Sequence, residues 1–297
     1  MHKFLTHCVL ILLLMTRHNV QAAELAAAPV QQPQTIATLS LAALDTLDTL
    51  GVPVQGLVQQ YALDYLQKYQ NDSYQNIGTF FEPDVEAIAA LNPDLIVIGP
   101  RSAKFKKQLS GITEVFDSSV WGGGFFQQFH EQTLALARLV NKEAEAINKL
   151  TAIQQKVSRV KSIAPERGKA LVLVVRGGKV YAFNTASRLG WVYQDLAIPS
   201  AIDNTESSDH GQLVSFEWIL SVHPDWLFIL DRDAGLGQAA AARTLMQNAV
   251  IAQTPAAQKN QMVYLDPYAW NVGYGLTAVD ISISQILDAY LNSELNP

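Results

Sequence analysis

The chain has 297 residues, of which 49% are hydrophobic and 16% are charged. Its 21 Lys and Arg residues stand against 27 Asp and Glu residues, a formal net charge of −6, which argues against nucleic acid or an anionic membrane as a partner. The only cysteine, Cys8, lies in an N-terminal segment that we expect to be removed, so the sequence predicts no disulfide.

The first 23 residues have the pattern of a cleavable export signal. Lys3 precedes an apolar run, 8–15, that is too short to span a bilayer, and Val20-Gln21-Ala22 forms a small-residue cleavage site before Ala23. Removal of 1–23 takes away two basic residues and leaves a formal charge of −8. We therefore expect an exported, soluble protein in the periplasm. Its residues 24–34, rich in Ala, Pro and Gln, are predicted to be a disordered lead-in.

Residues 35–124 alternate between short apolar strands and helices. The predicted strands are 35–39, 54–58, 95–98 and 115–116, and the predicted helices are 41–50, a short helix around Glu86, and 103–109. Such an alternation is typical of a largely parallel sheet with helices on both faces. We take 35–124 as an N-terminal α/β lobe.

Residues 125–163 contain no strand signal and no proline. Asn141-Lys142-Glu143 divides them into a helix that ends near 140 and a second helix over 142–163, about 33 Å long. A helix of that length can brace two lobes.

The alternating pattern then restarts and fills a C-terminal lobe, 164–297. Its predicted strands are 170–175, 180–183, 226–230 and 262–265, and its predicted helices are 189–196, 216–222 and 276–291. The sequence thus predicts an α/β fold of two Rossmann-like lobes with mainly parallel sheets, bridged by a long α-helix. The cleft between the lobes is the expected ligand site.

One design occurs twice in the chain, at positions 131 residues apart. Glu86 opens a short apolar helix that is followed by Pro93-Asp94 and a strand, and Glu217 opens another that is followed by Pro224-Asp225 and a strand. The separation is too large for a stacked repeat, so it indicates two similar lobes.

Three arginines follow predicted strands, where side chains face a ligand at the carboxyl edge of a parallel sheet. Arg101 and Arg232 occupy equivalent places in the repeat, and Arg188 follows the strand at 180–183. Arginine suits multi-donor recognition of oxyanions, so the three predict an anionic ligand. The alternative is that each makes a surface ion pair, with Asp231 as the local partner of Arg232.

The chain shows no nucleophile–base pair, no phosphate-binding loop and no zinc motif, which favours binding over catalysis. His210, in the loop Asp209-His210-Gly211, either reaches the cleft or is simply solvated.

Several motifs, in their order and spacing, resemble one family. They are Pro100-Arg101, Ser187-Arg188-Leu189-Gly190, His210-Gly211, Ser215-Phe216-Glu217, Asp231-Arg232 and Tyr264-Leu265-Asp266-Pro267. The family is that of the periplasmic ferric-siderophore binding proteins of ABC importers, in particular those for catecholate siderophores. The resemblance implies a class III periplasmic binding protein that has little hinge motion, acts as a monomer without a cofactor, and carries a ferric siderophore.

The resemblance also implies roles for individual residues. Arg101, Arg188 and Arg232 would grip the catecholate oxygens, and Lys104 would assist them. His210 would complete the iron shell of a tetradentate siderophore. The family's second ligand, a tyrosine just after Trp270, is replaced here by Asn271, a poor ligand for ferric iron. Either Tyr268 or Tyr274 would then substitute for it, or the protein would prefer siderophores that already fill most of the iron shell.

Glu86 and Glu217 would dock on the inner-membrane ABC permease dimer, because such glutamates pair with permease arginines in related importers. The alternative functions are binding of haem or cobalamin by the same fold, or catalysis by a secreted α/β enzyme with an unrecognised site.

Overall fold

A computed structural model describes residues 32–59, 64–121, 123–202 and 209–295. The predicted export signal and most of the predicted lead-in, residues 1–31, lie outside these ranges. Within the described ranges, no helix has both the length and the apolar character that crossing a membrane requires.

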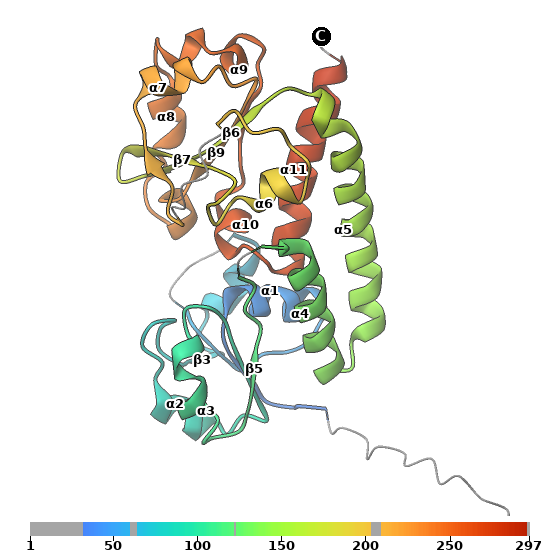
Figure 1. Ribbon diagram of the computed structural model, residues 1–297. Coiled ribbons are helices and arrows are strands. Elements are labelled where there is room, and N and C mark those ends of the chain that lie inside the picture. Colours follow the sequence, from blue (N-terminus) through green and yellow to red (C-terminus); the bar gives the residue numbers. More distant parts are fainter. Residues whose placement is uncertain (1–31, 60–63, 122, 203–208, 296–297) are drawn as a thin grey trace, which may run out of the picture. The chain divides into compact units, whose positions relative to one another are not determined.

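The first half of the chain forms a five-stranded sheet in which every strand is parallel to its neighbours, in the order β3-β2-β1-β4-β5 (Figure 1). Its elements are β1 (Ile36–Leu39), α1 (Leu41–Thr49), β2 (Gly56–Leu57), the 3₁₀ helix η1 (Asp64–Gln70), β3 (Gln75–Asn76), α2 (Val85–Leu91), β4 (Leu95–Ile98), the 3₁₀ helix η2 (Ala103–Phe105), α3 (Lys106–Leu109) and β5 (Glu114–Asp117).

The second half forms another five-stranded sheet, in the order β10-β9-β6-β7-β8. Its elements are η3 (Ala164–Glu166), β6 (Ala170–Arg176), β7 (Lys179–Phe183), α6 (Trp191–Gln194), β8 (Gln212–Leu213), α7 (Phe216–Ser221), β9 (Trp226–Asp231), η4 (Ala234–Leu236), α8 (Ala242–Met246), η5 (Ile251–Gln253), α9 (Pro255–Gln258), β10 (Met262–Tyr264), α10 (Pro267–Val272) and α11 (Leu276–Leu295). The strands β6, β9 and β10 are parallel, whereas β7 is antiparallel to β6 and to β8. The predicted α/β fold with two mainly parallel sheets is confirmed.

Two long helices connect the halves of the chain. The helices α4 (Phe125–Leu139) and α5 (Glu143–Ile163) match the predicted pair closely, and Asn141, with φ of +54°, turns the chain between them. Helix α5 packs against α4 and α11, and α11 also packs against α1 of the first half (Figure 1).

The buried Asp45 of α1 anchors the beginning of α11. Its carboxylate accepts the backbone N–H groups of Thr277 at 2.9 Å and Ala278 at 2.8 Å. Gly275 allows this approach, because a Cβ there would overlap the Asp45 side chain. The C-terminal helix is thus fastened to the first half, and the lobe boundaries 35–124, 125–163 and 164–297 stay a prediction.

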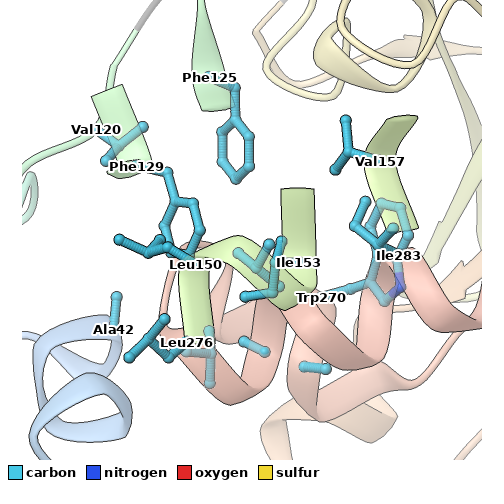
Figure 2. Packing of buried hydrophobic residues seen from close by; sticks show 14 of the residues in the cluster. Ala42, Val120, Phe125, Phe129, Leu150, Ile153, Val157, Trp270, Leu276 and Ile283 are labelled. Atoms are coloured by element: carbon cyan, nitrogen blue, oxygen red, sulfur yellow. The ribbon is translucent and has the colours of Figure 1, made fainter. Parts of the chain in front are cut away.

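One continuous hydrophobic core joins the two sheets. Alternate side chains of β1 and β4, such as Ile36 and Val97, share it with alternate side chains of β6 and β9, such as Val172 and Phe228. The helices α1, α4, α5, α10 and α11 also contribute to it, as Figure 2 shows for one part of this cluster. The outer face of each sheet has its own smaller core. A large apolar contact of this kind opposes hinge motion between the sheets.

The repeat recognised in the sequence is visible in the helices α2 and α7. Asp84 and Ser215 are their N-caps, and each side chain accepts the backbone N–H three residues further on. Asn92 and His223 end the two repeats with left-handed φ angles of +50° and +47°. Asp84 and Ser215 are 131 residues apart, and so are Asn92 and His223. The two copies therefore share their backbone conformation as well as their sequence pattern.

The Pro-Asp step of each repeat joins two strands of its sheet. Asp94 accepts the backbone N–H of Thr35, just before β1, at 2.9 Å, and Asp225 accepts that of Lys169, just before β6, at 3.0 Å. Each aspartate thereby sets the start of its following strand beside the first strand of the same sheet.

Some predicted elements are shorter than expected. The strand predicted at 54–58 is only Gly56–Leu57, and the helix predicted at 189–196 is reduced to α6. At the start of the predicted helix, Gly190 packs closely on the Thr185 backbone, where the chain turns before α6 begins. At its end, Ala197 adopts a left-handed φ of +55°, which a helix cannot contain.

Candidate ligand-binding site

The turns that carry Arg101 and Arg232 are held in matching ways. Ser102, next to Arg101, donates from its hydroxyl to the Leu39 carbonyl at the end of β1, at 3.1 Å. Asp233, next to Arg232, accepts the Gly177 N–H just beyond β6 at 2.6 Å. Each arginine therefore follows the strand of its repeat, β4 or β9, and its turn is hydrogen-bonded to the end of the neighbouring strand, β1 or β6.

Asp231 is not the partner of Arg232, which corrects the ion-pair interpretation. The Asp231 carboxylate is buried and accepts three backbone N–H groups, from Ala234 at 3.0 Å and from Ala241 and Ala242 at 2.7 Å each. Its charge is directed at the backbone that follows β9, which leaves the half-buried Arg232 guanidinium without that local counter-ion.

Arg188 lies in a braced loop between β7 and α6. The Asn184 side chain accepts the Ala186 N–H at 3.1 Å, and the Gln194 amide donates to the Thr185 carbonyl at 3.0 Å. The Arg188 guanidinium carbon is 5.4 Å from the centre of the Phe183 ring.

The surroundings of Arg188 lower its pKa to about 10. Loss of hydration by burial is the largest cause of the lowered pKa, followed by repulsion from Arg232, Arg101 and Arg176. The repulsion requires the guanidinium groups of Arg232, Arg101 and Arg176 each to lie within electrostatic range of Arg188, whose side chain is exposed. The structure thus gathers the three predicted arginines from both sheets.

Arg176 is a fourth member, which the sequence analysis did not single out. It is the last residue of β6, and the pairing of Val175 with Asp231 places it beside the turn of Arg232. Its guanidinium carbon lies 3.8 Å from the centre of the Tyr181 ring. The signal was available, since Arg176 also ends a strand.

Aromatic rings, instead of carboxylates, support these arginines. Besides the pairs on Phe183 and Tyr181, Arg101 lies 6.0 Å from the centre of the Phe80 ring. In the described part of the chain, none of the four makes an ion pair. Cation–π contacts stabilise a guanidinium without cancelling its charge, so the set keeps its attraction for anions.

Lys104 is exposed in η2, three residues beyond Arg101. Its ammonium nitrogen is 4.8 Å from the centre of the Phe105 ring. It belongs to the same turn as Arg101, but the structure shows no contact between the two.

His210 is exposed in the turn that precedes β8. Its neighbour Gly211 has φ of +74° and lies against the Phe183 ring, where a Cβ would overlap the ring. Only glycine allows this close approach. The turn that carries His210 therefore packs against the Phe183 ring, the same ring that contacts Arg188. Among the described residues no three His, Cys, Asp or Glu side chains gather as a metal site, so His210 would supply a single ligand to an incoming complex.

Trp270 and Asn271 lie in α10, and both side chains have partners in the protein. Trp270 is 4% exposed, stacks on Trp191 and donates its indole N–H to Gln285 at 3.2 Å. It therefore belongs to the core, and a ligand contact through its ring would require the core to open. The Asn271 amide packs against Gly235 and donates to the Arg232 carbonyl at 3.4 Å, so it helps to hold the turn of that arginine.

The two tyrosines proposed as substitutes differ in their surroundings. The Tyr274 hydroxyl lies beside Gly99 and Ser40, and burial raises the pKa of this phenol to about 12. A raised pKa disfavours the phenolate that ferric iron requires. Tyr268 is half-buried and packs at the edge of the main core, so it is the better candidate of the two.

Trp121 is a second residue that the sequence analysis missed. It is 69% exposed in the loop from β5 to α4, and Gln128 holds its backbone N–H and carbonyl at 3.0 and 2.8 Å. One end of the loop is tied to the first sheet by the bond from Ser118 to the Ile98 carbonyl, at 2.8 Å. At the other end the Phe125 ring stacks on Trp191, three residues beyond Arg188, with 4.6 Å between centres. The two ends of the segment that carries Trp121 are thus held near β4, which precedes Arg101, and near α6, which follows Arg188.

Glu86 and Glu217 are both exposed in the first turn of their helices. Hydrogen bonds from the backbone N–H of Glu217 itself and from the Ser215 side chain lower the pKa of the Glu217 carboxyl group. The two residues belong to different sheets, at the edge where the strands of each sheet end, because a helix that precedes a parallel strand begins at that edge.

Arginines that make no ion pair among the described residues, on a scaffold of two sheets with a shared core, are the arrangement expected of a protein that binds an anionic ligand. The chain belongs to the periplasmic binding protein family, whose model matches residues 36–269. It is 30% identical over 262 residues to the petrobactin-binding protein YclQ of Bacillus subtilis, covering 87% of this chain and 83% of YclQ. It is 31% identical over 267 residues to the ferric-anguibactin-binding protein FatB of Vibrio anguillarum, covering 87% of this chain and 83% of FatB.

Solved structures agree with this assignment. The crystal structure of YclQ superposes with a TM-score of 0.81, covering 87% of this chain and 92% of YclQ. The periplasmic catecholate-siderophore binding protein VctP of Vibrio cholerae has a TM-score of 0.78 at 29% identity, covering 86% of this chain and 94% of VctP. These relatives are substrate-binding proteins, not enzymes, as the sequence predicted for this chain.

Proposed function

We propose that this protein captures a ferric siderophore with catecholate groups between its two sheets and delivers it to an inner-membrane ABC permease. The observation that carries the proposal is the set of Arg101, Arg176, Arg188 and Arg232. Like charges that repel one another raise the free energy of the empty protein, and a polyanion relieves that repulsion when it binds. A ferric catecholate complex is such a polyanion, and the names of YclQ, FatB and VctP support a siderophore cargo.

Trp121 favours an aromatic cargo. The Gln128 side chain accepts the Trp121 N–H and donates to the carbonyls of Trp121 and Gly123. An exposed indole on a backbone held in this way is a preorganised stacking surface. Catecholate rings can stack on it while their oxygens face the arginines. Citrate, an anion without a ring, can use only the arginines.

A fluorescence titration tests the proposal. Ferric catecholate complexes, haem and cobalamin are each added to the protein, and quenching of tryptophan emission reports binding. We expect saturable binding of ferric catecholate and a loss of about 1.5 to 3 kcal/mol, or 10- to 150-fold in affinity, for alanine at any of the three predicted arginines. The matched control is Arg243→Ala, because Arg243 also stacks on an aromatic ring, that of Tyr264 at 4.2 Å, but does not affect Arg188. Tighter binding of haem or cobalamin, or unchanged affinity in every arginine variant, would contradict the proposal.

For delivery, we propose that Glu86 and Glu217 register the loaded protein on the two subunits of the permease. Two equivalent acids in two equivalent motifs fit a two-fold symmetric partner with matched basic sites. Exposed charges steer and orient docking more than they add affinity. The double variant Glu86→Lys/Glu217→Lys should lose iron uptake and keep ferric-catecholate affinity, whereas unimpaired uptake would exclude the role.

A further inference from the structure

Two cations lie opposite each other at the tip of the hairpin formed by β6 and β7. Arg176 and Lys179 are register partners across a two-residue turn, in which Gly177 and Gly178 have φ of +54° and +68°. Register partners in an antiparallel pair point to the same face of the sheet, where like charges repel each other. Among the described residues neither of them makes an ion pair, so the hairpin tip keeps both charges.

The hairpin directs these cations to the inner face of the second sheet, the face that packs on the main core. Tyr181 and Phe183 of β7 pack in that core, whereas Val180 between Phe183 and the turn belongs to the outer core. The two rings are therefore neighbours on one face of the strand, about 7 Å apart along it. Arg176 lies over the first ring and Arg188 over the second. Each guanidinium thus has its own aromatic support in one row.

An exposed apolar side chain borders the first of these rings. Leu213 of β8 is the register partner of Tyr181, so it points to the same inner face. It is 56% exposed, and it is one of only four large hydrophobic side chains exposed among the described residues. Arg176, the Tyr181 ring and Leu213 therefore follow one another across three neighbouring strands.

A carboxylate of the protein also reaches this hairpin, but it is directed at the backbone. Asp233 accepts the Gly177 N–H at 2.6 Å, and among the described residues it forms no ion pair with Arg176 or Lys179. It holds the turn and leaves both cations available as donors. An arginine supported by a ring offers two parallel N–H groups, the geometry that a carboxylate matches, and an apolar neighbour suits the hydrocarbon that carries the carboxylate.

We propose that Arg176, Tyr181 and Leu213 form a subsite for a carboxylate at the periphery of the ferric siderophore, with Lys179 at its border. The inference rests on the proposed siderophore-binding function and names a class of cargo within it, namely catecholates that also carry a carboxylate on the far side of a ring or on a linker. The guanidinium of Arg176 would bind the carboxylate through two N–H groups, and Leu213 would cover the apolar part of the same arm.

The test compares the ferric complexes of catechol and of 3,4-dihydroxybenzoate, each formed with excess ligand. Both offer the same catecholate oxygens, but only the second adds a carboxylate on the side of the ring away from iron. Tryptophan fluorescence titrations should show roughly tenfold tighter binding of the dihydroxybenzoate complex by the unaltered protein. Arg176→Met should remove most of this preference and Leu213→Ser part of it. The matched control Arg243→Met should keep it, because Arg243 also lies on a tyrosine ring but far along the chain from this hairpin, after β9.

A second variant separates a built subsite from attraction by charge at a distance. Arg176→Lys keeps the charge but loses the planar pair of N–H groups, so it should also lose most of the preference. A preference that persists unaltered in Arg176→Lys would overturn the subsite, as would equal affinity of the unaltered protein for the two complexes. Failure of both complexes to bind saturably would instead overturn the proposed siderophore-binding function, and the subsite with it.

Discussion

Replacing Arg188 by methionine should stabilise the empty protein and weaken ligand binding. Methionine keeps most of the side chain's length and apolar contact with Phe183 but removes the charge. The pKa of Arg188 is lowered from 12.5 to about 10, which corresponds to at most roughly 3 kcal/mol of unfavourable interaction of the charged form. Since the side chain is still exposed, solvent screening reduces this to about 1 kcal/mol.

The sign of the effect follows from protonation. A lowered arginine pKa means that the charged form is disfavoured in the folded state at every pH below about 10, and that the penalty disappears as the pH rises through 10 to 12.5. Between pH 5 and 9 the gain in Arg188→Met should therefore be constant. It should shrink at high salt, because salt screens the repulsion among the guanidinium groups.

Urea unfolding of the empty protein and fluorescence titration with ferric catecholate measure the two effects on the same variant. We expect an increase of about 1 kcal/mol in unfolding free energy together with a 10- to 150-fold loss of affinity. Arg243→Met serves as the control, and it should change neither quantity by much. A destabilised Arg188→Met protein with unchanged affinity would refute the reasoning, because it would mean that Arg188 serves the fold instead of the ligand.

Three further predictions address other residues. His210→Ala should weaken binding of tetradentate ferric complexes and spare hexadentate ones, since only the former leave iron positions open; equal losses for both in charge-transfer titrations would exclude coordination. Trp121→Ala should weaken ferric catecholate about tenfold and leave ferric citrate unchanged, with Trp121→Phe retaining most of the affinity; parallel titrations decide, and equal effects on both cargoes would exclude stacking. Burial raises the pKa of Asp45 from 3.8 to about 6, so this carboxyl group binds its proton more tightly in the folded state and stability should fall by roughly 3 kcal/mol as the pH rises from about 4 to 6. Urea unfolding across that range should show a flatter pH dependence in Asp45→Asn, and identical slopes for the two proteins would contradict the assignment.

Periodicity in the sequence was sufficient for the long elements and for the repeat. The helices α4 and α5 begin and end within about two residues of their predicted limits, because apolar spacing and the Asn141 break are local signals. The two-residue strands β3 and β8 escaped prediction, because pairing with a neighbouring strand creates them and their own residues are exposed. The anchoring of α11 by Asp45 joins positions more than 230 residues apart, which no local pattern reveals.

The positions of the arginines could be predicted, but whether a carboxylate pairs with them could not. The rule that ligands bind where parallel strands end applies to Arg101 and Arg232, which follow β4 and β9. It does not apply to Arg188, because β7, the strand before it, is antiparallel to β6. Sequence proximity suggested that Asp231 would neutralise Arg232, whereas the fold turns this carboxylate toward three backbone N–H groups. Proximity in sequence is a weak guide to ion pairing, because a buried carboxylate is bound first by whatever donors the surrounding backbone offers.

The continuous core and the unpaired arginines support each other in function. Repelling cations would move apart if the two sheets could separate, but the shared apolar core and the bond between Asp45 and α11 oppose that movement. Aromatic rings then hold three of the guanidinium groups without neutralising them. On the proposed function, the ligand would therefore meet donors that are already oriented and already charged, and little ordering of side chains would oppose binding. We therefore expect the proposed cargo to be recognised mainly by charge and by ring stacking, with little change in the relative position of the two sheets between the empty and the filled protein.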